Sequence, residues 1–196
     1  GEKESVFIHD LDEIDSLISQ LKSSFPPSSL HTFAVKSNPV LEILKFFVQR
    51  GMGLECASQE EVWLAIEAGC PMEMILHDGP AKTHAELEYC LLNNIGIIAN
   101  DEIDLNRIKE ILNSNNGQSI NKQISRIGIR INPLSGYGKI RETSVSTMDS
   151  KFGIVVDSSF SLQSILAEFP FLNGVHVHIG SQGISLDQLT LGVEKV

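Results

Sequence analysis

A single lysine follows the first strand-like run of the chain, in the segment FAVKSNP at residues 33–39. The apolar residues Phe33 to Val35 favour a buried strand, and the Ser-Asn-Pro sequence after Lys36 ends it. A lysine is costly at such a position unless its amine has a use. A desolvated amine can form a Schiff base with an aldehyde, so Lys36 is a candidate nucleophile. The alternative is a structural lysine whose ammonium reaches solvent.

Two further charged residues end later strand-like runs. Glu55 lies in GLECAS, residues 53–58, and Arg130 lies in IGIRINP, residues 127–133. If adjacent strands of one barrel carry these residues, the carboxylate of Glu55 can hold the ammonium of Lys36. Arg130 is a candidate partner for an anion. The alternatives are that Glu55 is a surface acid before a helix and that Arg130 forms a structural ion pair.

The segment GVHVHIGSQ carries the most specific pattern. His176 and His178 are two residues apart, so on a strand both side chains face the same side. They could bind a metal, although zinc normally takes a third protein ligand and only His77 is another candidate; alternatively, one ring stacks on a planar ligand. Gly180 and Ser181 follow, and their backbone N–H groups and hydroxyl could hold a phosphate. Two hydrogen-bonded core histidines are the third possibility.

Short apolar runs alternate with segments of helical periodicity, at a step of roughly twenty residues over the first four units. This repeat predicts parallel strands covered by helices, in an open doubly wound sheet or in a (β/α)8 barrel. The spacing does not choose between the two. The six predicted strands cover residues 32–35, 53–56, 74–76, 96–99, 126–131 and 175–179.

Helix-end signals accompany the strands. The segment 41–49 ends before Gly51, and the segment 59–68 follows the N-cap candidate Ser58 and stops at Gly69. Two further helices are predicted to begin at a capping box of Thr83 with Glu86 and at Asn100 or Asp101.

Six strands fall short of the eight that a closed barrel needs, and such a barrel typically takes about 250 residues. The 196 residues therefore predict the amino-terminal part of a barrel, with about six βα units and a last segment, DQLTLGVEKV, in the middle of a helix. A long Gly- and Ser-rich stretch, residues 132–153, follows the fifth strand. Loops at that end of a barrel strand usually carry function.

Composition excludes several classes of function. The formal charge of −10, from 25 acidic and 15 basic residues, argues against a nucleic-acid partner. Three cysteines without a CxxC pair argue against a disulfide framework and for a reducing compartment. No apolar run reaches the roughly 18 residues of a membrane span, and the first residues do not resemble a signal peptide. We expect a protein of the cytoplasm without a membrane partner.

In this order, the motifs FAVKSNP, GLECAS, RINP, SKFG and HVHIGSQ resemble those of the fold-type III pyridoxal-phosphate decarboxylases. The likeness is closest to the diaminopimelate decarboxylase branch, with the ornithine and arginine enzymes further away. It implies an alanine racemase-like (β/α)8 barrel and pyridoxal 5'-phosphate as the cofactor. It also implies decarboxylation of diaminopimelate or a basic amino acid, and a homodimer of the full-length protein.

The resemblance also assigns roles to individual residues. It implies that Lys36 forms the Schiff base with the cofactor, that His178 stacks on the cofactor ring and that Arg130 lies near it. Glu55 stands where the family more often has Asp. The positions matched to cofactor binding are Lys36, Glu55, Arg130, His178, Gly180 and Ser181.

Three alternatives stay open. An amino-acid racemase shares the barrel and the lysine, a silent relative could act by binding a decarboxylase subunit, and His176 with His178 could build a metal hydrolase. The resemblance also implies that later parts of the site and a carboxyl-terminal β domain are absent from residues 1–196, so the isolated polypeptide is expected to be weakly active or inactive.

Overall fold

The computed structural model describes residues 6–114, 117, 120, 126–134, 136, 147, 150–155, 161–180 and 184–196. The α-helices are α1 (Leu11–Ser24), α2 (Leu41–Gln49), α3 (Gln59–Glu67), α4 (His84–Leu92), α5 (Glu102–Asn113), α6 (Leu162–Glu168) and α7 (Leu186–Glu194). Two 3-10 turns are η1 (Val35–Ser37) and η2 (Met72–Met74). The strands are β1 (Thr32–Ala34), β2 (Gly53–Cys56), β3 (Ile75–His77), β4 (Gly96–Ala99), β5 (Ile127–Asn132), β6 (Ile154–Val155) and β7 (Gly174–Val177).

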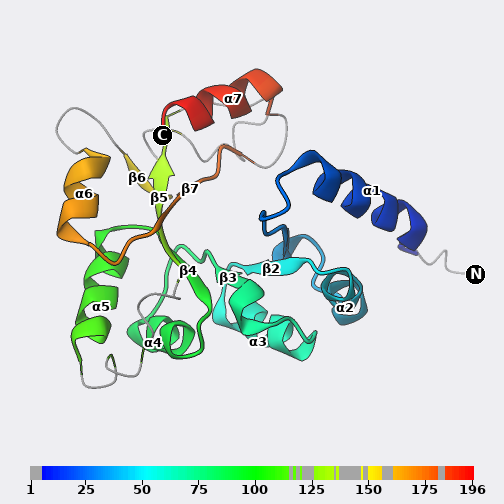
Figure 1. The fold of residues 1–196 in the computed structure, drawn as a ribbon, viewed down its shortest axis with the longest axis horizontal. Helices are drawn as coiled ribbons and strands as arrows, with labels where there is room; N and C mark the ends of the chain where they lie inside the picture. Colours follow the sequence, from blue (N-terminus) through cyan, green and yellow to red (C-terminus); the bar gives the residue numbers. More distant parts are fainter. Residues whose placement is uncertain are drawn as a thin grey trace, which may run out of the picture.

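These strands form one seven-stranded parallel sheet in the order β1-β2-β3-β4-β5-β6, with β7 also paired to β5. The sheet curves, and α2 to α6 form an outer layer around it (Figure 1). This alternation confirms the βα repeat. Parallel strands with helices on the outside present all their carboxyl ends along one edge, where barrel enzymes place their sites.

The core lies between the sheet and the outer helices. Leu54, Ile75, Ile97 and Ile129, one from each of β2 to β5, are completely buried and belong to a single apolar cluster with residues of α3, α4 and α5. Burying apolar side chains on this scale is the main favourable contribution to folding. The strands are therefore held at fixed positions, and so are the residues that follow them.

Helix starts follow the predicted signals. The hydroxyl of Ser58 accepts from the backbone N–H of Glu61, and Thr83 with Glu86 forms a reciprocal capping box. Asp101, rather than Asn100, is the N-cap of α5. The predicted helix at 41–49 has the bounds of α2.

Several predicted boundaries are corrected. The first strand ends at Ala34, and Lys36 lies in the turn η1 because Pro39 and the Ser-Asn pair before it favour a turn. The last strand ends at Val177, so His178 follows it. The helix predicted through the final residues begins at a capping box of Ser185 with Gln188 and ends at Glu194. Helices α1 and α6 and the two-residue strand β6 were not predicted.

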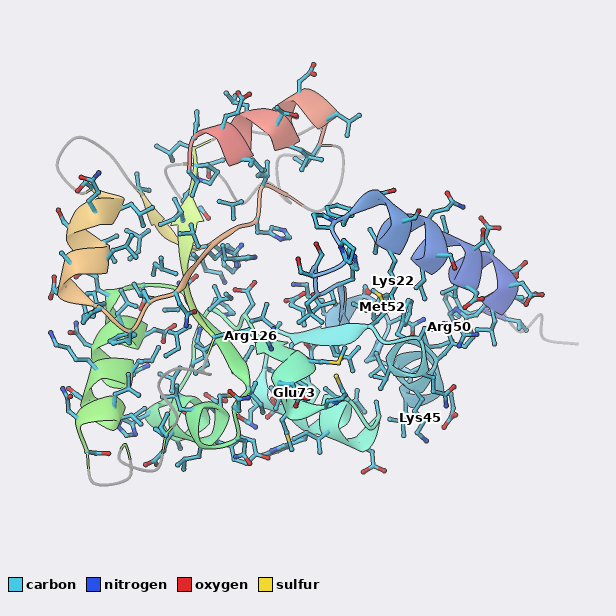
Figure 2. All side chains as sticks on the ribbon, in the orientation of Figure 1. Lys22, Lys45, Arg50, Met52, Glu73 and Arg126 are labelled. Carbon is cyan, nitrogen blue, oxygen red and sulfur yellow. The ribbon has the colours of Figure 1, made fainter. Side chains whose placement is uncertain are left out.

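The amino ends of the strands are tied together by polar contacts. Arg126, just before β5, donates to the backbone carbonyl of Glu73 in η2 and to that of Ile75 at the start of β3 (Figure 2). Arg126 thus links β3 and β5 across β4. The contacts of Arg126 at this edge are structural, and the charged residues predicted for a site lie at the opposite edge.

Candidate active site at the carboxyl ends of the strands

Lys36 and Glu55 meet at the ends of β1 and β2. Ala34 pairs with Glu55 in the parallel register, so Glu55 faces the same side of the sheet as Ala34, next to the turn that carries Lys36. The Nζ of Lys36 lies 3.3 Å from Oε1 of Glu55. The Lys36 side chain is 51% exposed, against 17% for Glu55. The predicted contact is present despite the longer acid, and the amine stays accessible to a ligand.

A second ionic cluster lies on the same side of the sheet. Arg130 on β5 pairs in register with His176 on β7, and Asp78, which follows β3, lies opposite them. The Nη1 of Arg130 is 3.6 Å from Oδ2 of Asp78, and the Nδ1 of His176 is 3.8 Å from Oδ1. Asp78 and Arg130 are both buried, so each compensates part of the other's desolvation.

Burial dominates the electrostatics of this cluster. Burial raises the pKa of the Asp78 carboxyl, and the positive charge of Arg130 opposes that rise. Burial, with the charges of Arg130 and Lys36, lowers the pKa of His176 to about 4. The same causes lower the pKa of His178. Both imidazoles are therefore neutral at pH 7, and the cations of the site are Lys36 and Arg130.

A cavity of about 270 Å³ opens among these residues. Phe152 forms one wall, and its ring centre lies 4.6 Å from Cζ of Arg130 in a cation–π contact. The cavity is lined by Lys36, Ala57, Asp78, Pro80, Arg130, Phe152 and His178. A larger cavity of about 440 Å³ lies between α5 and the segment before β7, and none of these residues lines it.

The structure thus brings together most of the predicted site. Lys36, Arg130 and His178 line one cavity, and Glu55 contacts Lys36. Gly180 is half-buried in the segment after β7. Ser181 lies outside the described residues.

The metal alternative has no support among the described residues, where no three His, Cys, Asp or Glu side chains gather to hold an ion. His176 faces Asp78. The imidazole of His77 lies away from both histidines, with Nδ1 3.1 Å from the carbonyl oxygen of Cys56. The three cysteines are buried and free, as expected.

Asp78 and Phe152 were missed as site residues. Leu76 pairs with Glu55, so the two side chains lie on the same face of the sheet. Because side chains alternate along a strand, Asp78, two residues after Leu76, lies on that face too. The signal that could have identified Asp78 as a site residue is a carboxylate at the end of a strand, directly before a Gly-Pro turn. Phe152 belongs to SKFG, which was noted only as a motif, because nothing local to it indicates that its ring reaches Arg130.

Comparisons with known proteins agree with this geometry. The family model described as "Pyridoxal-dependent decarboxylase, pyridoxal binding domain" matches residues 11–196. Diaminopimelate decarboxylase of Zymomonas mobilis is 32% identical over 171 residues, which cover 86% of this chain and 39% of that protein. The L-glutamyl-[BtrI acyl-carrier protein] decarboxylase of Niallia circulans is 31% identical over 191 residues, which cover 93% of this chain and 42% of that protein.

A solved structure is also similar. Diaminopimelate decarboxylase from Helicobacter pylori, complexed with L-lysine, superposes with a TM-score of 0.77 at 27% identity, over 95% of this chain and 47% of that one. The chain therefore spans less than half the length of each of these three relatives.

Proposed function

We propose that this chain, which belongs to the pyridoxal-dependent decarboxylases by their pyridoxal-binding domain, binds pyridoxal phosphate at the Lys36 cavity and serves the decarboxylation of an amino acid. The observation that carries the proposal is one accessible amine, Lys36, held by a carboxylate at the mouth of a cavity that also contains Arg130 and His178.

The residues present fit such a cofactor. The cavity of about 270 Å³ is close to the lower end of the roughly 300–1,000 Å³ that small-ligand sites occupy. Its walls offer an amine for an aldehyde, a flat imidazole for a ring, and a guanidinium for an oxygen.

Each side chain then has a defined task. The Nζ of Lys36 would bind the aldehyde carbon covalently, and Glu55 would keep that nitrogen at the cavity mouth. When bound, the cofactor supplies an electron sink for the electron pair left behind as the α-carboxylate departs as CO₂. Because the pKa of His178 is lowered by burial, its ring would stack in the neutral form and add no charge.

The remaining assignments follow the same geometry. Arg130, oriented by Asp78 and Phe152, would donate to an oxygen of the cofactor. Gly180 and Ser181, in the segment after β7, would contribute to holding the phosphate.

The substrate class and assembly are further parts of the proposal. Two of the relatives described above are named diaminopimelate decarboxylase, which supports diaminopimelate or a basic amino acid as substrate. We infer that residues 1–196 form the amino-terminal portion of the barrel and that the full-length protein is a homodimer of the cytoplasm. Within the described residues, no helix is long and apolar enough to cross a membrane.

The absorption spectrum of the full-length protein with pyridoxal phosphate tests the proposal. We expect a Schiff-base band in the wild type and in Lys45→Ala, a control that removes a lysine paired with Glu42 on α2, and no band in Lys36→Ala. CO₂ release should be assayed on diaminopimelate, ornithine, lysine and arginine. A band that survives in Lys36→Ala contradicts the role of this lysine, and inversion of an amino acid without CO₂ release would favour a racemase.

A further inference from the structure

Two loops on the cavity wall are joined behind it by buried polar contacts. The first loop, after β3, contains Asp78, Gly79 and Pro80, and the second contains Lys151, Phe152 and Gly153. Asp78 contacts Arg130 as an ion pair, and Phe152 covers the same guanidinium. The position of Arg130 therefore depends on where both loops are held.

Asn100, directly after β4, holds the second loop. Its Oδ1 accepts from the backbone N–H of Gly153 at 3.1 Å, and its Nδ2 donates to the carbonyl of Lys151 at 3.2 Å. These two bonds fix the backbone on both sides of Phe152. Asn100 is buried, so its end of each bond is shielded from bulk water.

Asn100 is itself tied to the first loop. Its backbone N–H donates to Oδ2 of Asp104 at 2.9 Å, and the same oxygen lies 2.8 Å from Nζ of Lys82. Lys82 is completely buried and donates to the carbonyl of Gly79 at 2.5 Å. A continuous chain of contacts thus runs from Gly79 through Lys82, Asp104 and Asn100 to the loop of Phe152.

We propose that Asn100 is a positioning residue for the cofactor site, which acts by holding Phe152 against Arg130. It does not line the cavity. It is also not needed to start α5, because Asp101 provides that cap. Its two side-chain bonds to backbone groups join segments 51 and 53 residues apart, and both end at the loop that carries Phe152. A third, longer contact of 3.5 Å joins its Nδ2 to Oδ2 of the neighbouring Asp101.

The relation to the reaction rests on the proposed function, but the geometric part does not. A ring over a guanidinium shifts the NMR signals of the guanidinium, so the Arg130 side-chain resonances report the position of Phe152 without any cofactor. Phe152→Leu in the full-length protein defines the value without the ring. We expect Asn100→Ala to move the Arg130 signals most of the way to that value.

The matched control is Asn173→Ala. The Oδ1 of Asn173 accepts from the backbone N–H of Ile127 at 3.0 Å, so it also joins two distant segments, but at the amino ends of the strands. We expect this variant to lose stability while the Arg130 signals stay at the wild-type position. If Asn100→Ala also leaves them unchanged, the proposal is wrong.

Cofactor affinity gives the second readout. We expect the Kd for pyridoxal phosphate to rise about fivefold or more in Asn100→Ala and by a similar factor in Phe152→Leu, since each removes roughly one interaction. The double variant should be no weaker than Phe152→Leu alone, because the two residues act through one contact. If the loss of cofactor affinity in the double variant equals the sum of the losses in the two single variants, the proposal is wrong. A wild type that binds no cofactor would instead contradict the proposed function, and the Arg130 signals would still decide the geometry.

Discussion

Among single residues, Asp78 is the most consequential one that was not predicted, because it forms a buried charge pair with the predicted site residue Arg130. Their side chains are only 6% and 8% exposed, and they lie 3.6 Å apart. Taking two charges out of water costs so much that the pair as a whole adds little to stability. Removing one partner is different, because it leaves the other charge buried and uncompensated.

We expect Asp78→Asn to lower the free energy of unfolding by about 3 kcal/mol, since Arg130 keeps its charge in a buried place. Urea unfolding at pH 7 measures this. The control, Asp15→Asn, removes a half-exposed partner of Arg50 and should cost below about 1 kcal/mol. Asp78→Leu combined with Arg130→Met should regain stability relative to Asp78→Asn. If Asp78→Asn and Asp15→Asn lower the free energy of unfolding equally, burial of the Asp78–Arg130 pair does not increase the cost of breaking it.

His176 should make the fold sensitive to mild acid. Its pKa is about 4 in the folded protein and near 6.5 when unfolded, so the unfolded chain binds the proton more readily between these values. Stability is therefore lost as the pH falls, by about 2 kcal/mol between pH 7 and pH 5 from this residue alone. We expect His176→Asn to remove that part of the pH dependence of urea unfolding. His77 and His178, whose pKa values are also lowered, should maintain the remaining pH dependence in this variant. An unchanged slope in His176→Asn contradicts this assignment.

The residues that could be predicted were those whose local sequence explains their position. Lys36 and Glu55 each end an apolar run, and adjacent parallel strands bring such ends together. Asp78 could not be paired with Arg130 in advance, because that contact depends on how far the sheet curves between β3 and β5. Asn100 was predicted only as a possible cap, and its bonds to the Phe152 loop depend on the path of a long connection.

At the scale of elements, the loop with Phe152 passes very close to β5. Gly153 has a φ of +76°, and a Cβ there would lie 3.0 Å from the carbonyl oxygen and 3.1 Å from Cγ of Arg130. Glycine is thus required both for the left-handed backbone and for the close approach. The approach lets β6 pair with Ile131 and Asn132 at the end of β5.

We expect Gly153→Ala to destabilise the protein more than Gly69→Ala and also to weaken cofactor binding. Gly69 has a similar φ of +80°, but nothing lies within 4 Å of its Cβ position, so this control isolates the backbone cost of about 1–2 kcal/mol. The additional loss in Gly153→Ala reflects displacement of Arg130. Thermal unfolding and cofactor titration measure the two effects. Equal losses in both variants, with unchanged affinity, would show that the close approach does not matter.

Elements with strong end signals were predicted well. Ser58 and the pair of Thr83 with Glu86 mark helix starts that the structure confirms. The strand β6 was missed because two residues give no periodic pattern. The predicted first strand ran one residue too far, to Val35 at the start of η1, because an apolar residue after Phe33 and Ala34 continues the strand pattern.

At the scale of the whole molecule, the curved parallel sheet with an outer layer of helices confirms the predicted α/β barrel class (Figure 1). The βα repeat could be predicted from the six apolar strand segments, because each βα unit buries its own apolar face. The choice of barrel came from the resemblance, since curvature depends on packing among all strands. The ends of β1, β2, β3, β5 and β7 meet around one cavity, and Lys36 is the lysine that lines it.

Chemical trapping is the sharpest test of whether Lys36 binds the cofactor. The full-length protein should be incubated with pyridoxal phosphate, reduced with borohydride and digested, and the modified peptide identified by mass spectrometry. We predict a single pyridoxyl group on the peptide that contains FAVKSNP, attached to Lys36. A modification placed mainly on another lysine, such as the partly exposed Lys45, or no modification at all, would contradict the assignment of this cavity as the cofactor site.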